Sequence, residues 1–175
     1  SQYLKIAEGC SNYCTYCIIP SLRGPFRSRT LESILKEAKQ LVESGARELI
    51  LIAQDVSRYG EDHYSEPSLV KLIQELSQLE DLKWIRLLYC YPERITDALI
   101  QQMKSNPKLL PYLDLPIQHA SDRILKAMGR KSRKKDLIAL MNNLRKEVPG
   151  IILRTSLITG FPGETEEDFN TLVSF

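Results

Sequence analysis

The stretch CSNYCTYC, residues 10–17, contains three of the four cysteines of this 175-residue chain. It directly follows an alternating apolar run, residues 3–9, which predicts a β-strand, so the three thiols are expected in a loop just past a strand end. Cys14 and Cys17 have the i, i+3 spacing at which two thiolates can ligate one metal centre, and Cys10, four residues upstream, can supply a third ligand. Three soft ligands favour iron–sulfur or zinc chemistry.

The spacing leaves other uses of these thiols open. A structural zinc site normally takes four ligands, and the fourth cysteine, Cys90, lies far along the chain, where a small buried apolar role is its simplest explanation. Three interpretations therefore remain open: a zinc knuckle, a disulfide with one spare thiol, and an iron–sulfur site with one open coordination position. We favour the iron–sulfur site because the motif follows a first strand and opens a series of strands and helices.

Composition narrows the class of protein. With 43% apolar and 26% charged residues, the chain is an ordinary globular sequence long enough for one domain. A net charge of +2 does not by itself indicate nucleic acid or a membrane. No apolar stretch of about 18 residues and no signal-peptide pattern is seen. Clustered cysteines without a disulfide framework predict a reducing, cytoplasmic setting. Both ends look cut, which predicts a piece of a longer protein.

Strands and helices alternate in five βα units. This alternation predicts a parallel sheet with right-handed crossovers, and it does not separate an open doubly wound sheet from a curved, barrel-like one. The apolar run 49–53 is typical of a parallel strand covered on both faces. Residues 18–29, rich in proline and arginine, and the polar residues 54–67 are expected to be loops. Expected strands begin near Tyr3, Arg47, Lys83, Pro111 and Ile151, and helix caps are expected at Thr30, Thr96, Ser121, Ser132 and Thr165.

The C-x-x-x-C-x-x-C spacing, with the aromatic Tyr16 before its last cysteine, resembles the cluster loop of radical S-adenosylmethionine enzymes. The resemblance implies that Cys10, Cys14 and Cys17 hold three irons of a 4Fe–4S cluster. The fourth iron would bind S-adenosylmethionine, and an electron passed to the sulfonium would release a 5′-deoxyadenosyl radical. The implied fold is α/β, a partial (βα)6-type barrel truncated to about five βα units. Residues 1–175 would then form one incomplete core domain that lacks the sixth unit.

Polar groups recur at the expected strand exits, where βα folds place their function. Gln54 occupies the place that helps to bind the methionine amino group in the family, although the family's common Gly-Gly-Glu form is absent. Gln118 and Ser121 are candidates for ribose or methionine contacts; for Ser121 a simple helix cap is favoured. Arg154 in the apolar fifth strand needs a partner, either a ligand carboxylate or a structural salt bridge. Gly160 allows close approach to a cofactor or simply forms a turn.

Other features have two interpretations each. Asp55 beside Gln54 is a site residue or an Asx turn or helix cap. His119 is a proton carrier or a hydrogen-bonded loop histidine. The three arginines of residues 18–29 face an acidic partner or solvent. The basic run 130–135 contacts RNA or, as favoured here, forms a charged helix start at the surface.

Longer matches narrow the resemblance to the methylthiotransferases, which insert sulfur into a C–H bond and methylate it. These matches are YLKIAEGC (3–10), RGPFRSR (23–29) and GFPGETEEDF (160–169). Three more segments resemble the branch that acts on an aspartate of a small-subunit ribosomal protein: AQDVSRYG (53–60), LYCYPERIT (88–96) and LPIQHAS (115–121). The tRNA-acting branch more often has Asn in place of Asp55 and Ser-Gly in place of His119-Ala120. The same chemistry on a tRNA adenosine, and a non-catalytic βα domain with a structural metal, remain as alternatives.

The resemblance also implies components outside this chain. A second 4Fe–4S cluster would belong to an N-terminal domain, and a small C-terminal β-domain would help to hold the substrate. The expected partners are the ribosomal small-subunit protein and an electron donor such as a flavodoxin, with RNA contact possible and no membrane. We therefore expect this chain alone to bind cluster and cofactor, and at most to cleave the cofactor, without completing methylthiolation.

Overall fold

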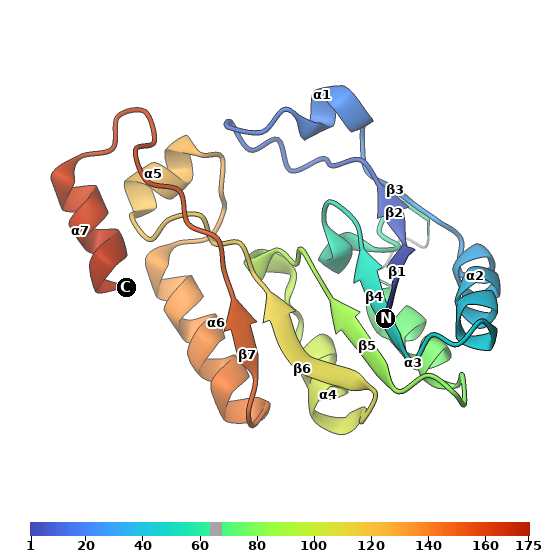
Figure 1. The fold of residues 1–175 in the computed structure, drawn as a ribbon. Helices are drawn as coiled ribbons and strands as arrows, with labels where there is room; N and C mark the ends of the chain where they lie inside the picture. The colour runs from blue at the N-terminus through green and yellow to red at the C-terminus, as the bar shows by residue number, and fades with distance from the viewer. Residues whose placement is uncertain (64–67) are drawn as a thin grey trace.

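The computed structural model of the chain describes residues 1–63 and 68–175. Its main feature is a sheet of parallel strands in the order β1-β4-β5-β6-β7 (Figure 1). Each strand pairs with the next strand along the βα series, so the predicted alternation and parallel pairing are confirmed. The strands are β1 (Gln2–Lys5), β4 (Glu48–Ile52), β5 (Trp84–Leu87), β6 (Leu109–Asp114) and β7 (Ile152–Arg154).

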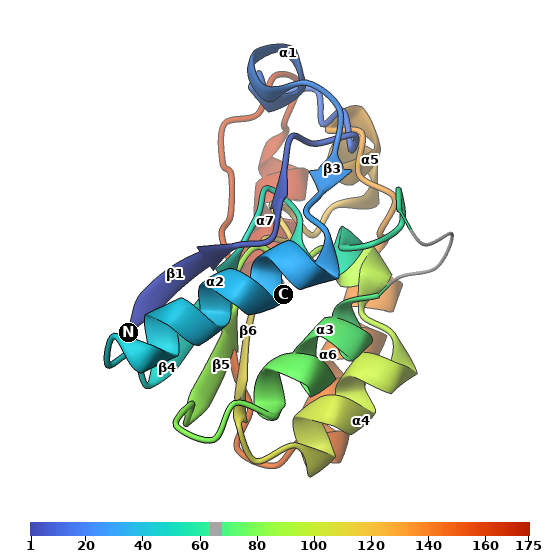
Figure 2. The same cartoon turned by 90° about the vertical axis from the view of Figure 1, so that its right-hand side faces the viewer.

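Four helices cover one face of this sheet, which distinguishes a barrel-type arrangement from a doubly wound sheet. Helices α2, α3, α4 and α6 contact one another in that order, α2 lies on β1, and α4 lies on β6 (Figure 2). Their buried side chains share a single core with the buried side chains of the strands. The helices span α2 (Leu31–Glu43), α3 (Leu69–Ser77), α4 (Asp97–Ser105) and α6 (Lys134–Glu147).

The strands are covered fully on the helix side only. Leu49 and Leu51 of β4 are completely buried, whereas Ile50 and Ile52 are half-buried. The expectation that residues 49–53 are covered on both faces is therefore wrong, because within the described residues no helix lies on the second face. That face carries polar side chains: Arg86 of β5 pairs with Glu48 at 2.7 Å across the strands.

Helix starts follow the predicted capping residues at three positions. The side chains of Thr30, Thr96 and Thr165 accept hydrogen bonds from backbone N–H groups of α2, α4 and α7 (Glu166–Ser174). Ser121 precedes α5 (Asp122–Ala127) without making a capping bond. Ser132 lies one residue outside the cap of α6, which Arg133 occupies, so the predicted cap at Ser132 is wrong.

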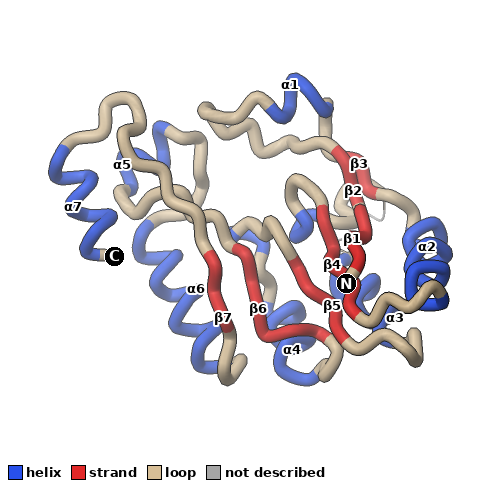
Figure 3. Tube along the Cα trace, in the orientation of Figure 1, coloured by secondary structure: helices blue, strands red, loops and turns tan. Residues whose placement is uncertain are grey.

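Residues 18–29, expected as a loop, include a short helix α1 (Ile19–Arg23) and a strand β3 (Arg27–Ser28) (Figure 3). The strand β3 pairs antiparallel with β2 (Ala7–Glu8) and so folds the segment back beside the cysteine stretch. The 3₁₀ helices η1 (Val56–Arg58) and η2 (Pro92–Arg94) follow β4 and β5. The polar loop expected at 54–67 extends into residues 64–67, which lie outside the described residues. Within the described chain, no helix combines the length and the apolarity that crossing a membrane requires.

The fold-back depends on a glycine at the start of the cysteine stretch. Gly9 has φ +79°, and a Cβ at this position would lie 2.2 Å from the carbonyl oxygen of Pro25. Gly9 therefore combines a left-handed backbone with a direct backbone approach, and no other residue type meets both conditions.

We expect Gly9→Ala to lower the free energy of unfolding by about 1–3 kcal/mol more than Gly150→Ala does. Gly150 has φ +75°, and a Cβ at this position would have no atom within 4 Å, so it carries the same backbone cost without the clash. Urea denaturation of both variants measures the difference. Equal losses of stability would contradict the steric role of Gly9.

Candidate active site

The cysteine loop is held from two sides by backbone contacts. The Cys10 N–H donates to the Gly24 carbonyl at 3.1 Å, which attaches the start of the loop to the β2–β3 fold-back. Thr15 attaches the middle of the loop to the end of α5: its N–H donates to Met128 O at 3.1 Å, and its hydroxyl donates to Ala127 O at 2.9 Å. Segments more than 100 residues apart thus position the thiols.

Asp55 anchors the same loop from the exit of β4. Its carboxylate is fully buried and accepts hydrogen bonds from Asn12 of the loop at 2.8 Å and from Ser57 at 2.5 Å. Arg94 lies 3.6 Å away as its charge partner. Burial raises the pKa of Asp55, and these hydrogen bonds oppose the rise. The predicted Asx turn or helix cap is not formed: Asp55 precedes η1 without a side-chain capping bond, and its carboxylate instead accepts from the side chains of Ser57 and Asn12.

The three cysteines of the loop line one cavity of about 160 Å³. All are free thiols; Cys10 and Cys14 are buried, and Cys17 is half-buried. Burial, followed by the charge of Asp55, raises the pKa of Cys10. Of the remaining predicted site residues, the cavity includes Tyr16, Gln54 and Gln118. Its lining consists of Cys10, Cys14, Tyr16, Cys17, Ile19, Gln54, Tyr89, Tyr91, Pro116, Gln118 and Arg130.

Two properties of this cavity fit an iron–sulfur cluster with a polar ligand beside it. Three thiols form the donor set, and the buried Gln54 Oε1 has no hydrogen-bond partner among residues 1–63 and 68–175, although it lies in the cavity wall. A structural zinc site takes four ligands, whereas a 4Fe–4S cluster held by three cysteines keeps one iron open for a further ligand. The three thiols of this cavity therefore fit a cluster better than a zinc knuckle.

Backbone strain is concentrated around the same cavity. Tyr13, Tyr89 and Gln118 are the non-glycine residues with positive φ in the described part of the chain, at 52°, 57° and 73°. One lies in the cysteine loop, and the other two line the cavity at the exits of β5 and β6. Left-handed backbone at bulky residues is costly and persists where surrounding structure enforces it, often at functional sites. The sequence carries no signal for this strain.

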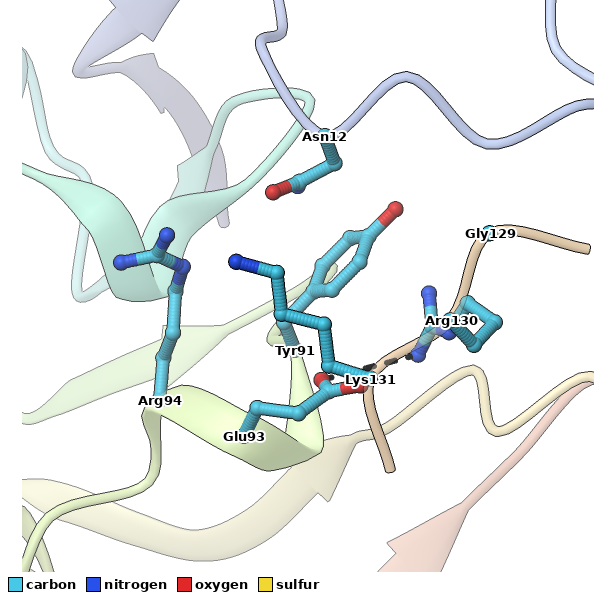
Figure 4. A pocket seen from close by; sticks show the side chains of 7 residues that line it. All are labelled: Asn12, Tyr91, Glu93, Arg94, Gly129, Arg130 and Lys131. Atoms are coloured by element: carbon cyan, nitrogen blue, oxygen red, sulfur yellow. Dashed lines mark ion pairs between the residues drawn. The ribbon is translucent and has the colours of Figure 1, made fainter. Parts of the chain in front are cut away.

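Tyr91 and Arg130 join the site without having been predicted as site residues. The Tyr91 hydroxyl lies 3.1 Å from Cys14 Sγ, and the Arg130 guanidinium lies 4.1 Å from the centre of the Tyr91 ring. Both residues also line a second cavity of about 200 Å³ next to the cysteine loop (Figure 4). The sequence signals for Tyr91 are its place at the exit of β5 and its position in the segment LYCYPERIT, and Arg130 belongs to the basic run 130–135.

Three predicted cofactor contacts lie outside the lining of the cysteine cavity. Ser121 donates to Asp168 at 2.6 Å and so links α5 to α7. The Arg154 side chain is 57% exposed and pairs with Asp114 at 2.8 Å. The expectation that Arg154 is buried is wrong, because it lies on the open face of the edge strand β7, and its structural salt bridge is present. Gly160 is exposed in its turn, and no atom lies near a Cβ built there.

The burial and the contacts of His119 and Cys90 fit structural roles. His119 is fully buried, and its Nδ1 accepts from the Ser121 N–H at 2.9 Å. Its Nε2 lies 3.4 Å from Glu164 of the glycine-rich turn. This fits the hydrogen-bonded loop histidine better than a proton carrier. Cys90 is fully buried, as predicted, and burial raises the pKa of its thiol.

The arginines of the fold-back segment have partners within the chain. Arg29 pairs with Glu37 at 2.6 Å and donates to Lys5 O at 2.7 Å. Arg27 donates to Pro25 O at 3.2 Å, and Arg23 lies 3.8 Å from Glu8. At least Arg29 therefore has a local structural role.

A barrel-type βα domain with three cysteines past its first strand defines a class of metal-cluster enzymes, and comparison identifies the family. Residues 4–175 match the model of the Radical SAM superfamily, and the chain belongs to this family. The whole chain is 63% identical to the "Ribosomal protein uS12 methylthiotransferase RimO" of Geobacter sulfurreducens and 60% identical to the protein of that name from Clostridium perfringens. It spans 39% of the length of each.

Solved structures share the fold. The radical S-adenosylmethionine methyltransferase TsrM from Kitasatospora setae superposes with a TM-score of 0.75 at 18% identity, over 98% of this chain and 33% of that chain. Methylornithine synthase PylB superposes with a TM-score of 0.64 at 15% identity, over 98% of this chain and 48% of that chain. These likenesses confirm the predicted α/β radical-enzyme fold.

The Ser121–Asp168 contact generates a pH prediction. Hydrogen bonds from Arg123, then Ser121 and Thr165, hold the pKa of Asp168 well below its usual range. An aspartate has a pKa of about 4 in the unfolded chain, and a lower pKa in the folded state means that the ionised carboxylate stabilises the fold at pH values above about 4. This stabilisation is lost as the pH falls toward the folded-state pKa. The stability gap between wild type and Asp168→Asn should therefore be largest near neutral pH and should shrink below about pH 4.

Thermal unfolding across pH measures this gap. Glu166→Gln, at an exposed position in the first turn of the same helix, is the matched control and should show a much smaller effect. A gap for Asp168→Asn that is constant with pH would contradict the role of its charge.

Proposed function

We propose that this chain is the radical S-adenosylmethionine core of a methylthiotransferase that modifies an aspartate of the small-subunit ribosomal protein uS12. The observation that carries the proposal is 60–63% identity, over all 175 residues, to relatives named for that activity. The aligned region includes the cysteine loop and the segments that resemble the ribosomal-protein branch. Because the chain spans only part of those relatives, the complete reaction belongs to a longer protein.

The residues of the cavity would divide the work. Cys10, Cys14 and Cys17 would hold a 4Fe–4S cluster and leave one iron open, and the cluster with S-adenosylmethionine would supply a radical that abstracts hydrogen from the substrate. Gln54, whose buried oxygen has no partner among the described residues, would accept a hydrogen bond from the cofactor. Tyr16 and Gln118 line the same cavity and would orient the cofactor. The observed contacts of Ser121 and Arg154 support positions in the scaffold, and Gly160 lies in an exposed turn.

The remaining components are proposals about the longer protein. A second 4Fe–4S cluster would lie in an N-terminal domain and take part in sulfur insertion. A cytoplasmic electron donor such as a flavodoxin would reduce the cluster of this chain. RNA contact would fall on the basic groove of about 390 Å³ between α5 and α6, whose lining includes Lys126, Lys131 and Arg133. These three side chains have no ion pair within the described residues, so their charge is free for an anionic partner.

The alternative substrate is a tRNA adenosine treated by the same chemistry. The pair His119-Ala120 favours the ribosomal protein, because the tRNA branch more often carries Ser-Gly there. His119 is buried against the glycine-rich turn, so the residues that differ between the two branches are packing residues of this turn.

The test uses the full-length enzyme, reconstituted anaerobically with iron and sulfide and supplied with reductant and S-adenosylmethionine. We expect 5′-deoxyadenosine and a mass increase on the target aspartate of uS12, with tRNA unmodified. The residue 1–175 chain alone should bind about four irons, as a single 4Fe–4S cluster requires, and form no methylthio product.

Cys14→Ala is the matched inactive variant and should lose both the cluster and 5′-deoxyadenosine. If tRNA is modified and uS12 is not, the substrate is the tRNA adenosine and the proposed ribosomal-protein substrate is wrong. Iron-free protein without cofactor cleavage would overturn the radical chemistry itself.

Gln54 gives a prediction that separates cofactor binding from folding. Gln54→Leu should weaken S-adenosylmethionine binding about tenfold, which corresponds to one lost hydrogen bond of about 1.4 kcal/mol. The apoprotein should not become less stable, because the substitution removes a buried acceptor that has no partner among the described residues.

Equilibrium binding of S-adenosylmethionine to the iron-loaded enzyme and thermal unfolding of the apoprotein measure the two effects. Gln101→Leu, on the exposed side of α4, is the control. Unchanged affinity would exclude Gln54 from the cofactor site.

A further inference from the structure

Tyr91 stands between a cluster ligand and a buried arginine. Its hydroxyl lies 3.1 Å from Cys14 Sγ, and the face of its ring lies 4.1 Å from the Arg130 guanidinium. In Figure 4 the ring stands between Arg130 and Arg94, and its hydroxyl points away from Glu93 toward the cysteine loop side. The three residues come from the loop between β2 and α1, the exit of β5 and the loop just after α5, so only the tertiary fold brings them together.

The direction of the hydrogen bond follows from the chemistry of the ligand. A cysteine that binds iron is a thiolate and has no proton to donate. The tyrosine hydroxyl must then be the donor. The ordinary pKa of a tyrosine hydroxyl is about 10, so the group carries a proton to donate at neutral pH. In the described part of the chain, no side chain donates a comparable hydrogen bond to Cys10 or Cys17.

Arg130 keeps the Tyr91 ring in this orientation. Its side chain is only 1% exposed, and its Nη2 donates to the Pro116 carbonyl at 2.9 Å. Glu93 lies 3.9 Å from the guanidinium and also accepts from the Ser132 N–H at 3.0 Å. A buried arginine that is paired, hydrogen-bonded and stacked on a ring has one defined position.

The backbone of Tyr91 is fixed from the opposite side. Its N–H donates to Ser57 Oγ at 3.0 Å, and Ser57 in turn donates to the buried Asp55. Asp55 also binds Asn12 of the cysteine loop. The hydroxyl of Tyr91 and the sulfur of Cys14 are therefore held at hydrogen-bond distance by contacts at both ends.

We propose that Tyr91, positioned by Arg130, donates a hydrogen bond to the Cys14 thiolate and raises the reduction potential of the bound cluster. Hydrogen bonds to cluster sulfurs and nearby positive charge favour the reduced state, because that state carries one more negative charge. The buried Arg130 guanidinium acts in the same direction as the hydrogen bond. The inference rests on the proposed function, in which Cys14 is a cluster ligand. Tyr91 and Arg130 act through Cys14 and are positioning residues.

The test measures the midpoint potential of the cluster in the full-length enzyme by a redox titration followed by electron paramagnetic resonance. Tyr91→Phe keeps the ring but removes the donor, so we expect a shift to more negative potential with unchanged iron per chain. Tyr89→Phe is the matched control: Tyr89 lines the same cavity and, within the described residues, makes no side-chain hydrogen bond to a cysteine.

Arg130→Lys provides an independent variant, because it keeps the charge but loses the planar stacking and the bond geometry that hold Tyr91. We expect a smaller shift in the same direction. Iron content and the circular dichroism spectrum of each variant report whether the fold and cluster are retained.

An unchanged potential in iron-loaded Tyr91→Phe would overturn the inference and leave the proposed function intact. An equal shift in Tyr89→Phe would also overturn it, because the effect would then come from the cavity in general. A wild-type enzyme that binds no iron would overturn the inference and the proposed function together.

Discussion

Parallel pairing of five strands is the constraint from which the site follows. When strands run in the same direction, all their carboxyl ends meet at one edge, and the loops that leave them are forced into one region. In this chain the connections that leave the strands carry the cysteines, which follow β1 and the short strand β2, Gln54 after β4, Tyr89 and Tyr91 after β5, and Gln118 after β6. The four helices on one face make the core, and the strand ends remain available for chemistry.

The cysteine loop itself has almost no local structure, so its shape comes from distant contacts. Gly9 admits the close backbone approach of Pro25, Thr15 binds the end of α5, and Asn12 binds the buried Asp55. Each contact uses a different part of the chain. A loop held in this way keeps three thiols in place before any metal arrives, which lowers the ordering cost of binding.

Backbone strain and a buried polar atom without a hydrogen-bond partner among the described residues occur at the wall of the cysteine cavity. Tyr89 and Gln118 adopt left-handed backbone at the cavity wall, and Gln54 buries an oxygen without a partner among the described residues. Each feature lowers stability, and each is tolerated because surrounding packing enforces it. The convergence of such features on one cavity supports a functional site more strongly than any single residue does. His119 Nε2, 3.4 Å from Glu164, is also buried without a hydrogen-bond partner among the described residues, outside the lining of this cavity. Ser121 joins α5 to the final helix.

The sequence by itself determined the succession of five βα units, the parallel pairing, the three candidate ligands and the family. Hydrophobic periodicity and the C-x-x-x-C-x-x-C spacing are local properties, and local properties can be read from neighbouring residues. The one-face packing of helices, the fold-back of residues 18–29 and the exposure of Arg154 were decided by tertiary structure, because burial depends on which faces distant elements cover. The same reason explains why Tyr91 and Arg130 were missed. Tyr91 meets Cys14 across 77 residues of chain, and Arg130 reaches the Tyr91 ring from a third segment. No pattern within one segment records these contacts.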